Sequence, residues 1–378
     1  MKAYLFPGQG SQHIGMGKEL FEAYPHIVEV SSDILGYCIK TLCLDDPNGL
    51  LGKTLYTQPA LYVVNALWYR RKAASDGDPD FFAGHSLGEY NALEAAGVMS
   101  FEDGLALVKK RGELMSQAPR GAMAAVIGPD AAKIDRILVE HALDLDIANY
   151  NSPNQTVVSG LVEDVSRAQT VFEDKRAMFI PLTASGAFHS RHMRDAQARF
   201  AQFLAGFEFS PPRIPVIANV DARPYSPDRI SLVLSEHIDH SVHWLDSVRY
   251  LLSKGVTEFH ELGPGQVLTK LVTSIRSDFE LNAPASPKSP PTVSPHALTS
   301  AGAVTSPADP VRPAEPQQQV DDWNREHAVG TPVLVAGSEF RHLTRAPAIV
   351  LFGHRPAIYL EGFEGYFSLN DVRPQHGK

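Results

Sequence analysis

Apolar residues fall along this chain in short continuous runs that alternate with longer stretches of helical periodicity. A first run, residues 3–6, stops at Pro7 and leads into a glycine-rich loop, and a second run, residues 81–83, precedes an Ala-rich helical stretch at 87–96. Helical periodicity also covers residues 18–37, 57–74 and 101–117. Short buried runs that alternate with helices predict an α/β fold.

The pattern changes within residues 122–182. Strands are expected there at residues 122–127, 145–148, 156–159 and 177–182, and helices at 129–141 and 162–172. The order strand, helix, strand, strand, helix, strand is that of a ferredoxin-like unit. We therefore predict a hydrolase-like large α/β domain with an inserted ferredoxin-like small domain, and a cleft between two such domains is a favoured place for a substrate.

The α/β alternation then resumes and is followed by a change in composition. A helix is expected at 191–204, a strand at 214–218, helices from 230 and at 242–252, a strand at 256–261 and a helix from 267. Residues 283–319 are rich in Pro, Ser and Ala, which predicts an extended linker. Runs at 331–335, 348–352 and 357–359 predict a small β-rich module over residues 320–378, for which a docking contact with a synthase or a neighbouring enzyme is one hypothesis.

These patterns divide the chain into five segments: the large domain in two parts, 1–120 and 187–282, the small domain at 121–186, the linker at 283–319 and the module at 320–378. With 378 residues, 44% of them hydrophobic, the chain can bury the cores of two or three domains. Its formal net charge of −9 argues against general binding to nucleic acid or an anionic membrane.

The cysteines and the lengths of the apolar runs bear on the compartment in which the protein is expected. Cys38 and Cys43, the two cysteines, match no zinc-binding spacing and have no accompanying Cys/His cluster, so we expect free thiols, a reducing compartment and no metal. No run reaches the length of a membrane span, and the N-terminal run is too short for a signal peptide. A cytoplasmic protein without a membrane partner is therefore expected.

The stretch Gly84-His85-Ser86-Leu87-Gly88 is the first candidate for chemistry. It matches the G-x-S-x-G nucleophile elbow, and it stands between a predicted strand and a predicted helix, as that motif requires. Glycines let the backbone bend tightly enough to expose the serine hydroxyl, and the following helix directs its positive end towards developing charge. The alternative is a chance Gly-Ser turn, which the strand and helix on either side make the weaker interpretation.

The glycine-rich loop after the first strand allows two interpretations. A dinucleotide-binding fingerprint would need a third glycine where His13 stands, so that interpretation fails on spacing. A tight loop at a strand end can expose a backbone N–H, and that of Gln9 could join the N–H of Leu87 as the two donors of an oxyanion hole. From sequence alone, a plain structural turn is the favoured explanation of the glycines.

Two further side chains stand out by position. Arg111 lies inside the apolar arc of the helix 101–117, where a permanently charged guanidinium needs an anion. That anion is either a buried Asp or Glu, the more ordinary answer, or a carboxylate of the substrate. His189 follows a strand end and a Gly-Ala-Phe turn, the same kind of position that holds Ser86, which makes it a candidate base.

Five motifs together resemble the malonyl-CoA:acyl carrier protein transacylase family. They are Phe6-Pro7-Gly8-Gln9-Gly10-Ser11-Gln12, Gly84-His85-Ser86-Leu87-Gly88-Glu89, Lys110-Arg111-Gly112, Gly186-Ala187-Phe188-His189 and Glu261-Leu262-Gly263-Pro264-Gly265. The resemblance covers roughly residues 1–280. Residues 37–42, 56–66 and the C-terminal block look more closely like stand-alone, trans-acting acyltransferases that serve polyketide synthases, and such a role suggests a monomer.

The resemblance implies a role for each matching residue. Ser86 is implied as the acylated nucleophile, His189 as its general base, and the N–H groups of Gln9 and Leu87 as the oxyanion hole. Arg111 is implied to pair with the malonyl carboxylate and Phe188 to favour malonyl over bulkier groups. The resemblance also implies that Gln58, His85, Asn151 and Gln155 line the cleft. It implies that the backbone carbonyl of His237 steadies His189, at a position where the family usually has glutamine.

The expected reaction is a ping-pong transfer by a Ser-His dyad. The malonyl group passes from malonyl-CoA to Ser86 and then to the phosphopantetheine thiol of an acyl carrier protein, with no bound cofactor or metal. An acyl hydrolase that clears carrier proteins would use Ser86 and His189 without needing Arg111. A non-catalytic docking protein would need none of the three. The sequence does not distinguish polyketide from fatty acid biosynthesis as the pathway served.

Overall fold

The computed structural model describes residues 1–184, 186–281, 316–335, 341–351, 355–358, 360, 367–369 and 372–374. The chain divides into two compact units, Met1–Phe279 and Glu280–Lys378. Most of the predicted linker, residues 282–315, lies outside the described residues. Among those residues, none of the helices combines the length and the apolar character that crossing a bilayer requires.

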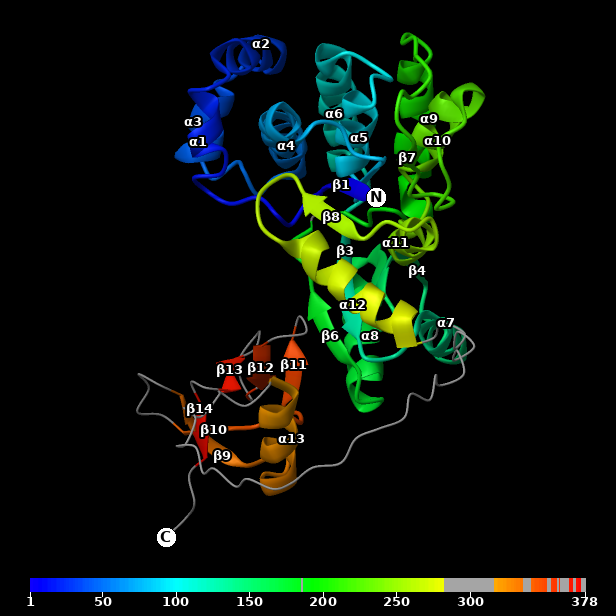
Figure 1. The fold of residues 1–378 in the computed structure, drawn as a ribbon. Helices are drawn as coiled ribbons and strands as arrows, with labels where there is room; N and C mark the ends of the chain where they lie inside the picture. Colours follow the sequence, from blue (N-terminus) through cyan, green and yellow to red (C-terminus); the bar gives the residue numbers. More distant parts are fainter. Residues whose placement is uncertain are drawn as a thin grey trace, which may run out of the picture. The chain divides into compact units, whose positions relative to one another are not determined.

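A four-stranded parallel sheet in the order β7-β2-β1-β8 forms the centre of the first unit (Figure 1). The central strand β1 (Lys2–Phe6) pairs on one side with β2 (Phe81–Gly84) and on the other with β8 (Glu258–Glu261), and β2 pairs with β7 (Val216–Ile217). The strands of a parallel sheet covered on both faces are buried throughout, so they read as continuous apolar runs. The α/β fold predicted from those runs is confirmed.

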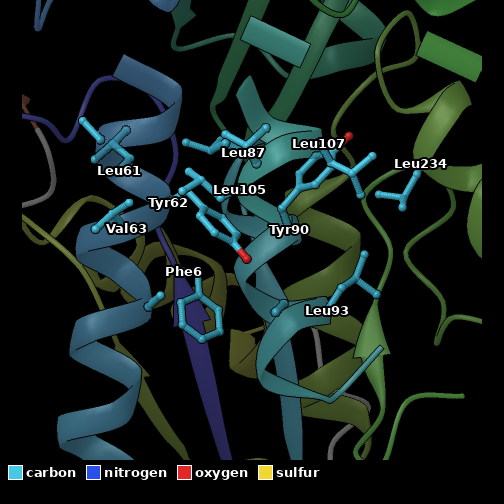
Figure 2. Close-up of a cluster of buried hydrophobic side chains, with 14 of the residues drawn as sticks. Phe6, Leu61, Tyr62, Val63, Leu87, Tyr90, Leu93, Leu105, Leu107 and Leu234 are labelled. Carbon is cyan, nitrogen blue, oxygen red and sulfur yellow. The ribbon is translucent and has the colours of Figure 1, made fainter. Parts of the chain in front are cut away.

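Alternate side chains of β1 face two different cores, because successive Cβ atoms of a strand point to opposite faces. Tyr4 and Phe6 face the larger core, and Figure 2 draws Phe6 as part of this cluster of buried side chains with Tyr62 and Tyr90. Ala3 and Leu5 face the second core. Helices of the larger core are α1 (Lys18–Phe21), α2 (Pro25–Leu35), α3 (Ile39–Leu44), α4 (Thr54–Asp76), α5 (Gly88–Ala95), α6 (Phe101–Ser116), α9 (Arg194–Leu204) and α10 (Ile230–Glu236). Those of the second core are α11 (Trp244–Ser253) and α12 (Val267–Leu281).

A second, antiparallel sheet is built from residues between α6 and α9. Its strands are β3 (Gly121–Ile127), β4 (Leu145–Ser152), β5 (Gln155–Leu161) and β6 (Met178–Pro181), in the order β4-β5-β3-β6. Ala124 and Val126 of β3 pack with α7 (Ala131–Glu140) and α8 (Val162–Asp174) in one core. Met123 and Ala125 belong instead to the larger core of the first unit, so the face of this sheet opposite the two helices is turned towards the parallel sheet.

The second unit contains one described helix and two three-stranded sheets. The sheets have the orders β10-β9-β14 and β11-β12-β13. Their strands are β9 (Pro332–Val335), β10 (Arg341–Leu343), β11 (Ile349–Leu351), β12 (Arg355–Ile358), β13 (Phe367–Ser368) and β14 (Val372–Pro374). Val320 and Trp323 of α13 (Pro316–Glu326) pack in a small core with Val333 and Ile358. Helix α13 thus begins at Pro316, within the last four residues of the predicted linker.

Several predicted boundaries in the first unit were also wrong by a few residues. Helix α4 begins at Thr54 and not at residue 57, and no side chain caps its start, so the sequence carries no capping signal there. Helix α3 was not predicted, since its six residues span fewer than two turns. The helix expected from residue 191 opens with a 3-10 turn, Arg191–Met193, before α9 begins. Ser100 caps the start of α6 by accepting a hydrogen bond from the Asp103 N–H at 3.0 Å.

Candidate active site

Ser86 stands on a sharp turn between β2 and α5. Its φ of 50° lies in the left-handed region, which non-glycine residues rarely adopt and which is common at functional sites. A Cβ added at Gly84 would lie 2.0 Å from the carbonyl carbon of Gly88, and one added at Gly88 would lie 2.0 Å from the carbonyl oxygen of Phe6. Side chains at either glycine would thus prevent the turn from closing, and the strand, turn and helix predicted for the elbow are confirmed.

His189 meets Ser86 from a segment far away in the sequence. The Ser86 Oγ lies 2.7 Å from His189 Nε2. On the other side of the ring, Nδ1 lies 3.0 Å from the carbonyl oxygen of His237 and 3.1 Å from that of His240. Carbonyl oxygens only accept hydrogen bonds, so Nδ1 carries the proton and Nε2 is free to accept the proton of Ser86.

The environment of His189 keeps its ring neutral. The side chain is 4% exposed. Burial, together with the positive charge of Arg111 and the nearby ring of His85, lowers the pKa of His189 to about 3. A neutral imidazole whose Nε2 faces a serine hydroxyl is in the protonation state that a general base needs.

Arg111 reaches the same hydroxyl from α6. It is 1% exposed, and its Nη2 donates to Ser86 Oγ at 3.2 Å while its Nη1 donates to Gln58 Oε1 at 2.8 Å. Gln58 in turn donates to the sulfur of Met115 at 3.4 Å, which orients its amide oxygen towards the guanidinium. No Asp or Glu of the described residues forms an ion pair with Arg111. The direct buried ion pair that sequence reasoning favoured is therefore absent among the described residues, and Glu89 acts on the guanidinium only electrostatically, without an ion-pair contact.

Two backbone amides flank the same hydroxyl. A Cβ added at Gly8 would lie 2.4 Å from the carbonyl oxygen of His85, so the glycine-rich loop after β1 packs directly on the elbow. Gln9 and Leu87 both line the cavity that contains Ser86. In the part of the chain that the structure describes, neither the N–H of Gln9 nor that of Leu87 has a protein acceptor. The pair is therefore available to a charged oxygen, the property that an oxyanion hole needs.

The cavity around Ser86 has a volume of about 540 Å³. Beside the groups already described, it is lined mainly by apolar side chains of α6, the antiparallel sheet and α12, among them Met115, Met123, Val157, Leu182, Phe188, Val267, Leu268 and Leu271. Polar groups lie at its floor: His85 Nε2 is 2.8 Å from Asn151 Oδ1 and 3.4 Å from Asn149 Nδ2. An apolar cavity with a few convergent polar groups is the usual form of a small-molecule site.

Most sequence-predicted site residues meet in this cavity, and two do not line it. Gln155 begins β5, pairs with Ile127 across the small sheet and lies away from the cavity. His237 is fully buried behind His189, which it contacts through its backbone carbonyl. Sequence reasoning did not single out Asn149, which follows a predicted strand, or Asn219, whose side-chain oxygen accepts the Ser86 N–H at 2.7 Å. A polar residue directly after a buried strand was the available signal for both.

The comparison with protein families decides the classification. A family model described as "Acyl transferase domain" matches residues 3–264. The chain belongs to this acyl transferase family. Its resemblance to malonyl-CoA:acyl carrier protein transacylases, stated above from five motifs, is confirmed by close relatives of that name.

Similar proteins include both curated sequences and solved structures. The acyl transferase is 55% identical over 284 residues to the polyketide biosynthesis malonyl CoA-acyl carrier protein transacylase BaeC of Bacillus velezensis, a match that covers 74% of this chain and 98% of BaeC. The crystal structure of malonyl CoA-acyl carrier protein transacylase from Burkholderia pseudomallei is 50% identical, with a TM-score of 0.72 over 75% of this chain and 99% of that one. A second structure shows AntF, a type II PKS acyl-carrier protein, in complex with its malonyl-transacylase PlMCAT. It is 37% identical, with a TM-score of 0.70 over 73% and 93% of the two chains.

Proposed function

We propose that this acyl transferase moves a malonyl group from malonyl-CoA, through an ester on Ser86, to the phosphopantetheine thiol of an acyl carrier protein. The observation that carries the proposal is the position of Arg111. Its guanidinium is buried, lacks a carboxylate partner among the described residues and donates to the hydroxyl that would be acylated. Such a cation matches an acyl group that carries its own carboxylate.

In the first half-reaction, His189 Nε2 takes the hydroxyl proton of Ser86 while Oγ attacks the thioester carbonyl of malonyl-CoA. The carbonyl oxygen becomes an oxyanion, which the N–H groups of Gln9 and Leu87 stabilise. The C–S bond then breaks, and the CoA thiolate takes the proton from His189. Malonyl-Ser86 and CoA thiol are the products. Since His189 Nδ1 donates to two backbone carbonyls, we assign no triad carboxylate among the described residues.

The second half-reaction repeats these steps with a different thiol. The thiol of phosphopantetheine on a carrier protein gives its proton to His189 and attacks the malonyl ester, and Ser86 leaves as the protonated hydroxyl. Two names support this partner: BaeC is a transacylase of polyketide biosynthesis, and PlMCAT is bound to an acyl-carrier protein. We place the chain with the trans-acting enzymes of polyketide synthases in the cytoplasm.

Finer assignments belong to the same proposal. The sheet order β4-β5-β3-β6, with α7 and α8 in one core, supports a ferredoxin-like small domain inserted into a hydrolase-like large one. The described strands of the second unit support a small module that contains a helix as well as β-structure. In the cavity, Phe188 limits the size of the acyl group, Gln58 orients Arg111, and His85 with Asn151 lines the floor.

The intact mass of the protein after brief exposure to malonyl-CoA tests the proposal, with holo acyl carrier protein added afterwards. We expect a malonyl adduct in the wild type, none in Ser86→Ala, a weakened adduct in Arg111→Ala, and transfer of the adduct to the carrier. Release of acyl groups from carrier thioesters to water, without a malonyl adduct, would support an acyl hydrolase instead. Adduct formation in Ser86→Ala would contradict the assigned nucleophile.

A further inference from the structure

A buried carboxyl group lies directly behind the catalytic pair. Glu89, in the first turn of α5, is 0% exposed and does not line the cavity, so it cannot touch a substrate there. Burying a carboxyl group is costly unless its oxygens are hydrogen-bonded. Its Oε2 accepts the backbone N–H of Asn219 at 2.6 Å, and its Oε1 accepts the hydroxyl of Tyr225. Burial raises the pKa of Glu89 to about 8.

One arm of this arrangement leads to the nucleophile. The Asn219 side chain accepts the N–H of Ser86 at 2.7 Å and donates to the carbonyl oxygen of Gly84 at 2.7 Å. The asparagine thus bridges Gly84 and Ser86, the first half of the turn, and Ser86 is the residue that holds a φ of 50°. Since Glu89 fixes the backbone of Asn219, the carboxyl group acts on the elbow through one intermediate residue.

The other arm leads to the base. His237 Nδ1 lies 3.6 Å from Glu89 Oε1, and both side chains are fully buried. Neither ring nitrogen of His237 has a hydrogen-bond partner among the described residues, so this carboxyl is the polar group that its ring faces. The same residue packs its ring 5.3 Å from that of His189 and accepts the His189 Nδ1–H with its carbonyl.

We propose that Glu89 is a positioning residue that holds Ser86 and His189 in register, through Asn219 on one side and His237 on the other. The catalytic pair comes from segments 103 residues apart, so its 2.7 Å contact depends on how two separate elements are held. One buried group that is hydrogen-bonded to Asn219 and in contact with the ring of His237 can set that contact more tightly than either arm alone. Misplacement of catalytic groups by about 1 Å costs on the order of 100-fold in rate.

A Tyr225 variant serves as the control that separates an effect on the position of the catalytic pair from an effect on the stability of the protein. Its hydroxyl donates to the same carboxyl group but leads to neither Ser86 nor His189. Tyr225→Phe therefore removes one hydrogen bond of Glu89 and leaves both arms in place. Glu89→Ala removes the carboxyl group that holds the backbone of Asn219, and Asn219→Ala removes the side chain that holds the elbow. His237→Leu removes the ring that faces Glu89 but keeps the backbone carbonyl.

The experiment measures the second-order rate at which a small fluorophosphonate labels Ser86 in the full chain, together with the melting temperature. This probe needs the serine and its base but neither the malonyl carboxylate nor CoA, so its outcome does not depend on the proposed transfer reaction. We expect Glu89→Ala and Asn219→Ala to slow labelling on the order of tenfold to 100-fold. Tyr225→Phe, even at an equal loss of melting temperature, should stay within about threefold of wild type.

Two further measurements complete the test. With malonyl-CoA, which brings in the proposed function, the loss should appear in the acylation rate at saturation, while the half-saturating concentration stays within about twofold. His237→Gln, whose amide can face Glu89, should label roughly fivefold faster than His237→Leu. Labelling rates that fall in parallel with melting temperature in all variants, Tyr225→Phe included, would overturn the inference, as would equal rates for the two His237 variants. A wild type that is labelled by the probe but not malonylated would refute the transfer reaction alone.

Discussion

Replacing Arg111 by alanine perturbs the feature on which the assigned substrate depends. The guanidinium is 1% exposed and has a glutamine amide and the Ser86 hydroxyl as hydrogen-bond partners, and no carboxylate of the described residues forms an ion pair with it. With a malonyl group in place, its carboxylate would become the missing anion. Removing one partner of a buried, hydrogen-bonded charge pair costs about 2–5 kcal/mol. That corresponds to a loss of roughly 30-fold to 5,000-fold in kcat/KM for malonyl-CoA.

The assay compares malonyl-CoA with acetyl-CoA, which lacks the free carboxylate, as donors to a holo carrier protein. In Arg111→Ala, we expect kcat/KM for acetyl-CoA to change by less than about tenfold, because no charge pair is lost. Lys110→Ala serves as the control, since it removes the same charge from the neighbouring residue, which pairs with Glu113 on the surface of α6 at 3.4 Å. Equal losses for the two donors in Arg111→Ala would refute the reasoning, because the guanidinium would then support the fold or the nucleophile and not the acyl carboxylate.

Three further outcomes follow from the structure. Because burial and the neighbouring guanidinium lower the pKa of His189 to about 3, kcat/KM should show no acid limb near pH 6.5, and a limb at that pH would mean that the base titrates normally. Burial raises the pKa of Glu89 from 4.5 to about 8, so the folded state favours the neutral carboxyl group. The stabilisation that this proton brings is therefore fully present below pH 4.5 and is lost as the pH rises to 8. Denaturant unfolding at several pH values should show this decline in the wild type and less of it in Glu89→Gln. Gly88→Ala would place a Cβ 2.0 Å from the carbonyl oxygen of Phe6, so it should lower the free energy of unfolding by about 1–3 kcal/mol or more. Gly52→Ala, which has open space at its Cβ, is the control and should cause no such loss. Equal melting temperatures of the two variants would contradict the crowding argument.

Local patterns carried much of the prediction. The two glycines around Ser86 encode a turn that no larger residue can make, and the apolar runs on either side encode the strand and the helix. Arg111 could be singled out because a charge inside an apolar helical arc violates the rule that governs its neighbours. These features depend on residues a few positions apart in the sequence. The backbone geometry of strands, turns and helices fixes how such residues lie relative to one another, so the sequence pattern alone can predict them.

The tertiary structure decided what each of these residues meets. The sequence alone left a buried ion pair as the more ordinary partner of Arg111, and the fold excludes it among the described residues by surrounding the guanidinium with Gln58, Tyr90 and Ser86. Gln155, expected in the cleft, lies away from it because the small sheet pairs it with Ile127.

The network of Glu89, Asn219 and His237 likewise has no local signature. Its members belong to α5, to the segment after β7 and to the end of α10, and they meet because the parallel sheet brings those elements together at the carboxyl ends of its strands. Periodicity reports which face of an element is buried, and thus predicts that a polar group must find a partner. Which partner it finds depends on contacts between residues that are remote in sequence, and these are set by packing of the whole domain.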